Sequence, residues 1–103
     1  MPRHPDTQSP DPGLLILASL ASGPKHGYAI TQDVLAFAGV ALGPGTLYGA
    51  IGRLEGRGLI EPVESIDRRR PYRLTDDGRL VLRSQLSVLE RLTSTALGRL
   101  ASV

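Results

Sequence analysis

The chain has 103 residues and a net charge of +2, with 12 Lys and Arg against 10 Asp and Glu. This length suits a single small domain, and so mild a basic balance does not by itself identify a partner. The sequence contains no cysteine, which excludes disulfides, thiolate metal sites and a cysteine nucleophile. The longest apolar run, Leu14–Ala18, is too short to cross a bilayer, so we expect a cytoplasmic protein without a membrane segment.

The beginning of the chain predicts an arm followed by a buried helix. Residues 1–12 contain four prolines and no apolar periodicity, which is typical of a disordered arm. Asp11 is placed to cap a helix with Pro12 at its first position, where the fixed φ of proline suits a helix start. The following LLILASLA is apolar on all sides, which predicts a buried helix that ends at Ser22-Gly23-Pro24.

A second helix is predicted over residues 26–38. Ile30, Val34 and Phe37 fall on one face, and Gly39 is a suitable end. We expect Tyr28 to pack between helices, with its hydroxyl available to a phosphate. Val40-Ala41-Leu42 is interpreted as a very short strand.

The third helix is predicted from about Pro44 to about Gly58, and its glycines need an explanation. On a helical wheel the apolar residues gather on one side: Leu47, Ala50, Ile51 and Leu54. The glycines gather on the opposite side: Gly45, Gly49, Gly52 and Gly56. Each glycine costs about 1 kcal/mol relative to alanine inside a helix. An exposed face could tolerate glycine because nothing packs there. The common register of all four instead favours close approach of the helix to a partner such as the DNA major groove.

A β-hairpin and a long helix complete the chain. Leu59–Ser65 and Pro71–Leu74 are predicted as the two strands, with Ile66–Arg70 as the connecting loop. Thr75 caps a last helix that reaches about Ala101. Three helices, a hairpin and a long helix are the order of a winged helix-turn-helix with a C-terminal extension. The predicted fold is therefore mainly α with a small β-hairpin wing.

The last helix carries a heptad-like apolar seam on one face. Its members are Leu82, Leu86, Leu89, Ala96 and Leu100, and Thr93 interrupts it. Val81, Val88 and Leu92 add a second apolar row, from which Leu92 joins the predicted dimerisation residues. The preceding domain is too small to cover so long a face, so we predict that the same helix of a second subunit packs on it in a homodimer. We divide the chain into the arm over 1–12, a winged helix-turn-helix domain over 13–74 and a C-terminal dimerisation helix over 75–103.

Three stretches together resemble the PadR-like transcriptional regulators. They are LILASLASGPKHGYAI at 15–30, GPGTLYGAIGRLEGRGLI at 43–60 and RRPYRLTDDGR at 69–79. The resemblance implies a winged helix-turn-helix followed by a dimerisation helix. It also implies a repressor that binds double-stranded DNA, and an effector that is a small aromatic molecule. Gly52 stands where this family commonly has a longer polar or basic residue, which implies that shape readout and phosphate contacts carry more of the recognition.

The predicted DNA contacts lie at the start of the second helix, on the third helix and on the wing. They are Lys25, His26, Tyr28, Pro44, Gly45, Thr46, Tyr48, Gly49, Gly52, Arg53, Arg68, Arg69 and Arg70. Free N–H groups at a helix start bind anions, and arginines on a wing reach phosphates or the minor groove. Two alternatives stay open here. His26 could instead form a local hydrogen bond at its helix start, and the arginine run could be an ordinary solvated loop.

The sequence does not predict an enzyme. His4 lies in the predicted arm, His26 stands alone, and no His, Asp and Glu residues have the spacing of metal ligands. We therefore expect no catalytic residues, no metal and no cofactor. The leading interpretation is a dimeric, sequence-specific DNA-binding repressor on a pseudo-palindromic operator. The alternative is a winged-helix module for protein–protein assembly, since the glycine face offers few polar side chains to read DNA.

Overall fold

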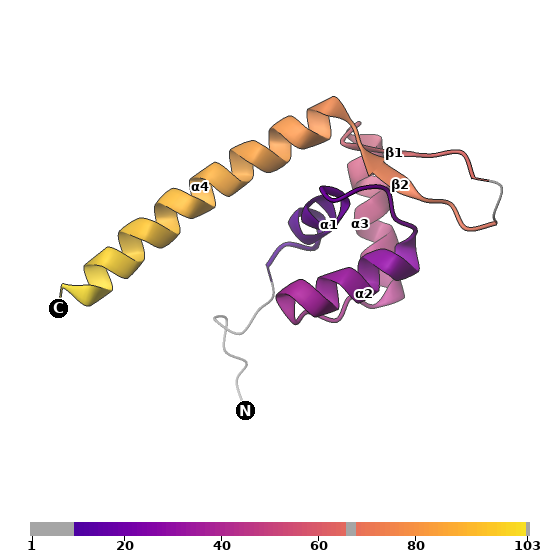
Figure 1. The fold of residues 1–103 in the computed structure, drawn as a ribbon. Coiled ribbons are helices and arrows are strands. Elements are labelled where there is room, and N and C mark those ends of the chain that lie inside the picture. Colours follow the sequence, from indigo (N-terminus) through magenta and orange to yellow (C-terminus); the bar gives the residue numbers. More distant parts are fainter. Residues whose placement is uncertain (1–9, 66–67, 103) are drawn as a thin grey trace.

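A computed structural model describes residues 10–65 and 68–102 of the chain. Within these ranges the order of elements matches the prediction (Figure 1). The elements are α1 Pro12–Leu20, α2 Gly27–Ala38, α3 Pro44–Gly56, β1 Ile60–Pro62, β2 Tyr72–Leu74 and α4 Asp76–Ala101. The predicted mainly α fold with a hairpin wing and a long last helix is confirmed. Residues 1–9 of the predicted arm, Ile66 and Asp67 of the predicted loop, and Val103 lie outside the described residues.

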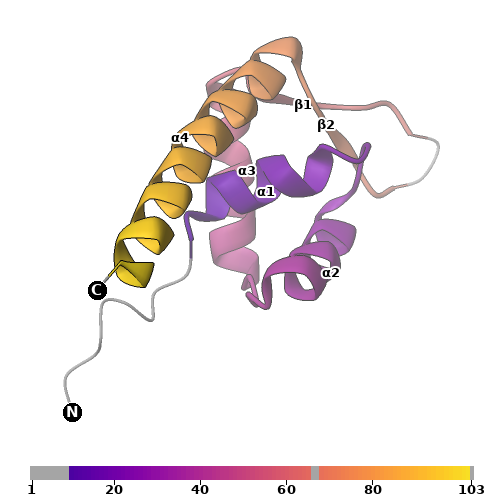
Figure 2. The ribbon, with the colours of Figure 1, turned by 60° about the vertical axis from the view of Figure 1, so that its left-hand side comes forward.

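Helix α1 is the centre of the fold because it is apolar on nearly every side. Leu15, Ile16, Leu17 and Leu20 are buried, and α1 contacts α2, α3, β2 and α4. Figure 2 shows α1 lying between α4 and α2. The elements around α1 and their connections complete the core with Ile30, Val34, Leu42, Leu47, Ala50, Ile51, Leu54, Leu59, Ile60, Leu74 and Leu82. Phe37, predicted on the same face as Ile30 and Val34, is instead 51% exposed. Each buried leucine or isoleucine stabilises the fold by about 1.5–3 kcal/mol.

Local sequence signals fix the helix ends. The Asp11 carboxylate accepts a hydrogen bond from the Leu14 amide at 3.0 Å, and Pro12 begins α1 as predicted. Gly39 ends α2 in the left-handed conformation, with φ 69°. Helix α3 ends at Gly56, two residues before the predicted end, and Gly58, with φ 74°, turns the chain into β1.

The wing is shorter than predicted. β1 and β2 pair antiparallel, with Ile60 opposite Leu74 and Pro62 opposite Tyr72. β1 ends at Pro62, whose ring nitrogen has no hydrogen to donate. The prediction of a strand at 40–42 is wrong, because Leu42 is drawn into the core instead. Outside the two strands, Lys25 forms an isolated antiparallel bridge with Tyr72.

Helix α4 is fastened to the body only at its beginning. Thr75 caps it by accepting from the Gly78 amide at 3.0 Å, and the Thr75 hydroxyl donates to the Gly58 carbonyl at 2.6 Å. Gly78 is buried against the Leu59 carbonyl, where a side chain would overlap that oxygen. After Leu82, all described residues of α4 are exposed, and the helix runs away from the body on the side opposite the wing (Figure 1). Its 26 residues are about 39 Å long at 1.5 Å per residue. Within the described ranges, no helix combines the length and the apolar character that crossing a membrane requires.

Candidate nucleic-acid interface

The outward face of α3 is bare, as the helical wheel predicted. Leu47, Ala50, Ile51 and Leu54 are buried, whereas Gly45, Gly49, Gly52 and Gly56 are all exposed. A Cβ atom built at Gly45, Gly52 or Gly56 would meet no heavy atom within 4 Å. These glycines are therefore not required by packing inside the subunit. We call this outward strip, Gly45, Gly49, Gly52 and Gly56, the glycine face.

Arg53 flanks the glycine face on one edge, and Glu55 flanks it on the other; both are exposed. The Arg53 Nη1 atom would lie 3.5 Å from a Cβ at Gly49, one turn earlier on the helix. The guanidinium thus extends along the strip toward the N-terminus of α3, across the space that a larger residue at 49 would fill. Pro44 and Thr46 are exposed at the start of the same helix. The predicted α3 contacts are therefore accessible on one surface.

Tyr48 connects α3 to the start of α2. A Cβ atom at Gly27 would lie 2.5 Å from the Tyr48 hydroxyl oxygen and 3.0 Å from Cζ, so a side chain at 27 would displace this ring from its position. The phenol consequently stands beside the first turn of α2, and its hydroxyl faces the region that His26 caps. Sequence reasoning missed Gly27, because no periodicity marks it. Its only signal is its place between His26 and Tyr28 in one of the stretches that resemble the PadR-like family.

His26 and the wing come together at the start of α2. The His26 Nδ1 atom accepts from the Ala29 amide at 3.4 Å, which makes His26 the N-cap of α2. On the other side of the ring, Nε2 lies 3.5 Å from Nη1 of Arg69. Arg68, Arg69 and Arg70 are all exposed. The fold therefore brings Arg69 of the wing to the start of α2, although the two are far apart in the sequence.

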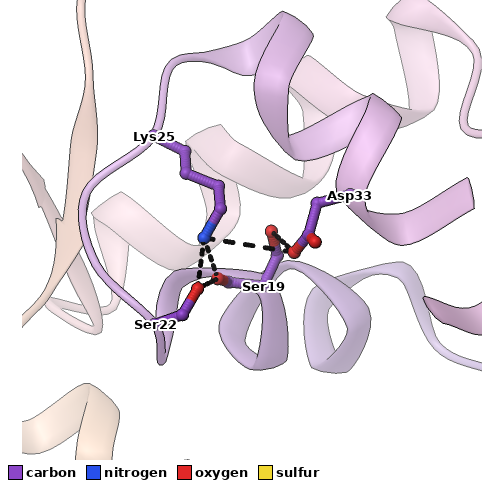
Figure 3. A network of polar contacts seen from close by, with 4 residues as sticks. All are labelled: Ser19, Ser22, Lys25 and Asp33. Atoms are coloured by element: carbon purple, nitrogen blue, oxygen red, sulfur yellow. Dashed lines mark hydrogen bonds and ion pairs between the residues drawn. The ribbon is translucent and has the colours of Figure 1, made fainter. Parts of the chain in front are cut away.

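Two predicted contact residues lie differently from the expectation. The Lys25 ammonium points into the body and contacts Ser19, Ser22 and Asp33 (Figure 3). Tyr28 does not pack between helices: its side chain is 64% exposed, and its hydroxyl accepts from the Gln32 amide at 2.9 Å. Its ring lies outward because the neighbouring Gly27 and Ile30 take the buried positions of this turn.

The seam on α4 divides into a covered start and an uncovered remainder. Leu82 is buried in its own subunit, so its predicted place in a dimer interface is corrected to the core. Leu86, Leu89, Ala96 and Leu100 continue the seam and, with Leu92 of the second row, are all exposed. Leu89 is 40% exposed and Leu100 is 73% exposed. This much exposed leucine along one helix face is unusual for a monomer.

Among the residues that the structure describes, no three or more His, Cys, Asp or Glu side chains are grouped so that they could hold a metal ion. Each buried side-chain nitrogen or oxygen in the same part of the chain has a hydrogen-bond partner. The surface built by α2, α3 and the wing has the elements of a helix-turn-helix interface with nucleic acid.

Comparison with known proteins agrees with this geometry. The profile of the Transcriptional regulator PadR-like family matches residues 16–84. The chain belongs to this family. It is 38% identical over 88 residues to a transcriptional regulator of Mycobacterium tuberculosis, covering 82% of this chain and 81% of that protein. It is also 45% identical over 83 residues to an uncharacterized 37.1 kDa protein in a transposon of Streptomyces fradiae. That match covers 81% of this chain but 24% of the longer relative.

Solved structures of PadR-like proteins share the fold. A PadR family transcription regulator of Clostridium difficile superposes with a TM-score of 0.76 at 25% identity, covering 84% of this chain and 94% of that one. A PadR-like transcriptional regulator of Bacillus cereus superposes with a TM-score of 0.77 at 20% identity, over 85% and 89% of the two chains. The PadR-like family consists of transcriptional regulators, so this chain is a regulator and not an enzyme.

Proposed function

We propose that this PadR-like regulator binds a pseudo-palindromic operator in double-stranded DNA as a homodimer and represses transcription. The observation that carries the proposal is the glycine face of α3, which is exposed and bare and is flanked by Arg53. A regulator of this kind acts where the DNA is, which in the bacteria that hold its named relatives is the cytoplasm.

The glycine face has no explanation within the subunit. Alanine would fit at Gly52 without contact, and each such replacement inside a helix stabilises it by about 1 kcal/mol. The chain thus forgoes stability along a single strip. Close approach of the helix axis to the floor of the major groove would explain the glycine face, because a Cβ atom or a longer side chain would hold the helix away from the bases.

Phosphate binding is supported by the donors near the start of α2. His26 lies at the start of α2, where its Nδ1 atom accepts from the Ala29 amide. Nη1 of Arg69 lies 3.5 Å from Nε2 of the same ring, so the wing brings a positive charge to this helix start. An exposed guanidinium beside the first turn of a helix suits a phosphate, because charged donors form strong hydrogen bonds with phosphate oxygens. The Tyr48 hydroxyl stands near the same turn and adds a neutral donor.

A homodimer is supported by the uncovered part of the α4 seam. Leu86, Leu89 and Leu100 are exposed on one face of a helix that leaves its own body. A second α4 covers this face with matching leucines. The two-fold arrangement then presents two α3 helices about 34 Å apart, one turn of DNA. Repression follows when the bound dimer occludes a promoter. The small aromatic effector implied by the family resemblance is part of the proposal, and release of the duplex by phenolic acids tests it.

The alternative function is a winged-helix module for protein assembly, favoured by how few polar side chains the glycine face offers. A titration of the protein onto duplexes selected from a random DNA pool, repeated at several salt concentrations, separates the two. A DNA-binding dimer loses affinity steeply with salt, with a logarithmic slope of about −0.9 for each phosphate contact. Enrichment of a two-fold sequence identifies the operator. Negligible duplex binding at low salt would leave the assembly module as the better account.

A further inference from the structure

The backbone of Lys25 joins the helical body to the wing. Its amide donates to the Tyr72 carbonyl at 3.0 Å, and the Tyr72 amide donates back to the Lys25 carbonyl at 2.9 Å. The next residue, His26, caps α2 and lies beside Arg69. The position of residue 25 therefore decides where the wing meets the start of α2.

The side chain of Lys25 turns away from that surface. Its Nζ atom donates to the Ser19 carbonyl at 2.5 Å and to the Ser22 hydroxyl at 2.6 Å, and lies 4.0 Å from an Asp33 carboxylate oxygen (Figure 3). Only 19% of the side chain is exposed. An ammonium group has three protons, so two are used by these oxygens and the third is near Asp33. The Ser19 carbonyl is also one of the last in α1, where a positive charge is favourable.

Ser19 extends the contact to α2. Its side chain is buried, with 1% of the residue exposed, and its hydroxyl donates to the Asp33 carboxylate at 2.7 Å. A buried hydroxyl without a partner would be destabilising, so the hydrogen bond from Ser19 stabilises the observed position of the Asp33 carboxylate. The end of α1, the turn at 21–26 and the middle of α2 are therefore connected through one ammonium and one carboxylate.

We propose that Lys25 is a positioning residue for DNA binding: its ammonium, held by Ser19, Ser22 and Asp33, fixes the α1–α2 turn and thereby the wing that pairs with it. This assignment replaces a phosphate contact at Lys25. If the ammonium swung out to a phosphate, it would leave the Ser19 carbonyl and the Asp33 carboxylate without their cation. The proposal rests on the proposed function in one respect, that the wing contacts DNA.

The first test compares Lys25→Met, Asp33→Asn and the double variant in the full chain. Affinity is measured for a duplex recovered from the random pool, under conditions in which each variant is folded. Both single variants should lose about three- to tenfold in affinity. The double variant should lose no more affinity than the single variant that binds DNA less tightly. Asp33→Asn decides the matter, because removing a negative charge would by itself increase attraction to DNA. Asp77→Asn, an exposed carboxylate outside the group, is the control and should not weaken binding.

The opposite pattern would overturn the proposal. If Lys25 contacts a phosphate, Lys25→Met makes the salt slope shallower by about 0.9, whereas Asp33→Asn keeps or increases affinity. If the group serves only stability, the folded variants bind as the parent does.

The second test needs no DNA. The Tyr72 amide, which donates to the Lys25 carbonyl, should exchange with solvent about tenfold faster in Lys25→Met and in Asp33→Asn. Unchanged protection at Tyr72 would show that the group does not hold the wing, and would reject the proposal. A parent protein that fails to bind any duplex would reject the proposed function alone, since this exchange experiment still gives its answer.

Discussion

The outward faces of α3 and α4 are both exposed, yet their surfaces are opposite in character. α3 presents the glycine face, with Arg53 lying along it. α4 presents a row of leucines, including Leu89 and Leu100. Both faces reduce the stability of the isolated subunit, one through backbone entropy and the other through exposed apolar area.

The difference indicates two kinds of partner. A leucine row is stabilised when a matching apolar surface covers it, because its long side chains then bury a large apolar area. A bare strip gains nothing from an apolar partner, because it has no side chains to bury. It suits instead a surface that must come close to the helix backbone, such as the floor of a DNA groove. The following substitutions exchange or remove these properties.

The largest effect is expected at the leucine row. Leu89→Asp places a carboxylate in the middle of the predicted dimer interface, where its desolvation is unfavourable. The dimer dissociation constant should rise by about 100-fold or more, measured by sedimentation equilibrium. Ser87→Asp, on the other side of the same helix, is the control and should stay dimeric. Dimers that persist in Leu89→Asp would place the interface elsewhere.

The second effect is expected at the glycine face. Gly49→Leu fills the space across which Arg53 extends and holds α3 away from its partner, so duplex affinity should fall about tenfold or more. The free energy of unfolding should not fall, because the position is exposed and leucine favours a helix over glycine. Ala36→Leu adds a leucine at an exposed position of α2 and is the control. DNA binding at the parent level in Gly49→Leu would remove close approach as the explanation.

A smaller effect is expected on the wing. Arg69→Ala should weaken binding to all duplexes about three- to tenfold and reduce the magnitude of the salt slope by about 0.9. Binding isotherms at several salt concentrations give both quantities. Arg91→Ala removes the same charge from the exposed α4 surface and should leave the slope as it is. A slope that does not change in Arg69→Ala would exclude this side chain from the phosphate contacts.

The smallest effect is expected for Gly52→Ala, where stability and DNA affinity should change in opposite directions. Gly52→Ala should raise the free energy of unfolding by up to about 1 kcal/mol, because alanine favours the helix and meets no neighbour. The same change should lower DNA affinity, though less than Gly49→Leu does. Gly98→Ala, at an equally open position of α4, should raise stability without changing DNA binding. A Gly52→Ala protein that binds DNA better would indicate that glycine is only tolerated on this face.

The sequence predicts those features that depend on neighbours along the chain. The opposed leucines and glycines of α3 follow from helical periodicity, and the caps at Asp11 and Thr75 follow from residue type and place. The order of elements follows from these signals. The exposed positions of Arg53 and of the wing arginines were predictable for the same reason.

The missed features depend on contacts between distant segments. Residues 40–42 were predicted as a strand from composition, but Leu42 packs in the core, and Lys25 pairs with Tyr72 instead. Lys25 resembles a phosphate ligand in sequence, and only the fold brings Asp33 to it. Leu82 belongs to the heptad pattern and is nevertheless covered by its own subunit. Helical periodicity predicts which side chains share an apolar face, but it does not predict whether the same subunit or a partner covers that face.

The joint between wing and last helix is a single residue. β2 ends at Leu74 and α4 begins at Asp76, while Thr75 between them is tied to the Gly58 carbonyl and caps the helix. Helix α4 is about 39 Å long and is attached to the body at this one end, so a small change in its angle moves its far end by a large distance. In the proposed homodimer, a tilt of one α4 against the other would move the attached hairpin, so the angle between the two helices would set the spacing of the two wings.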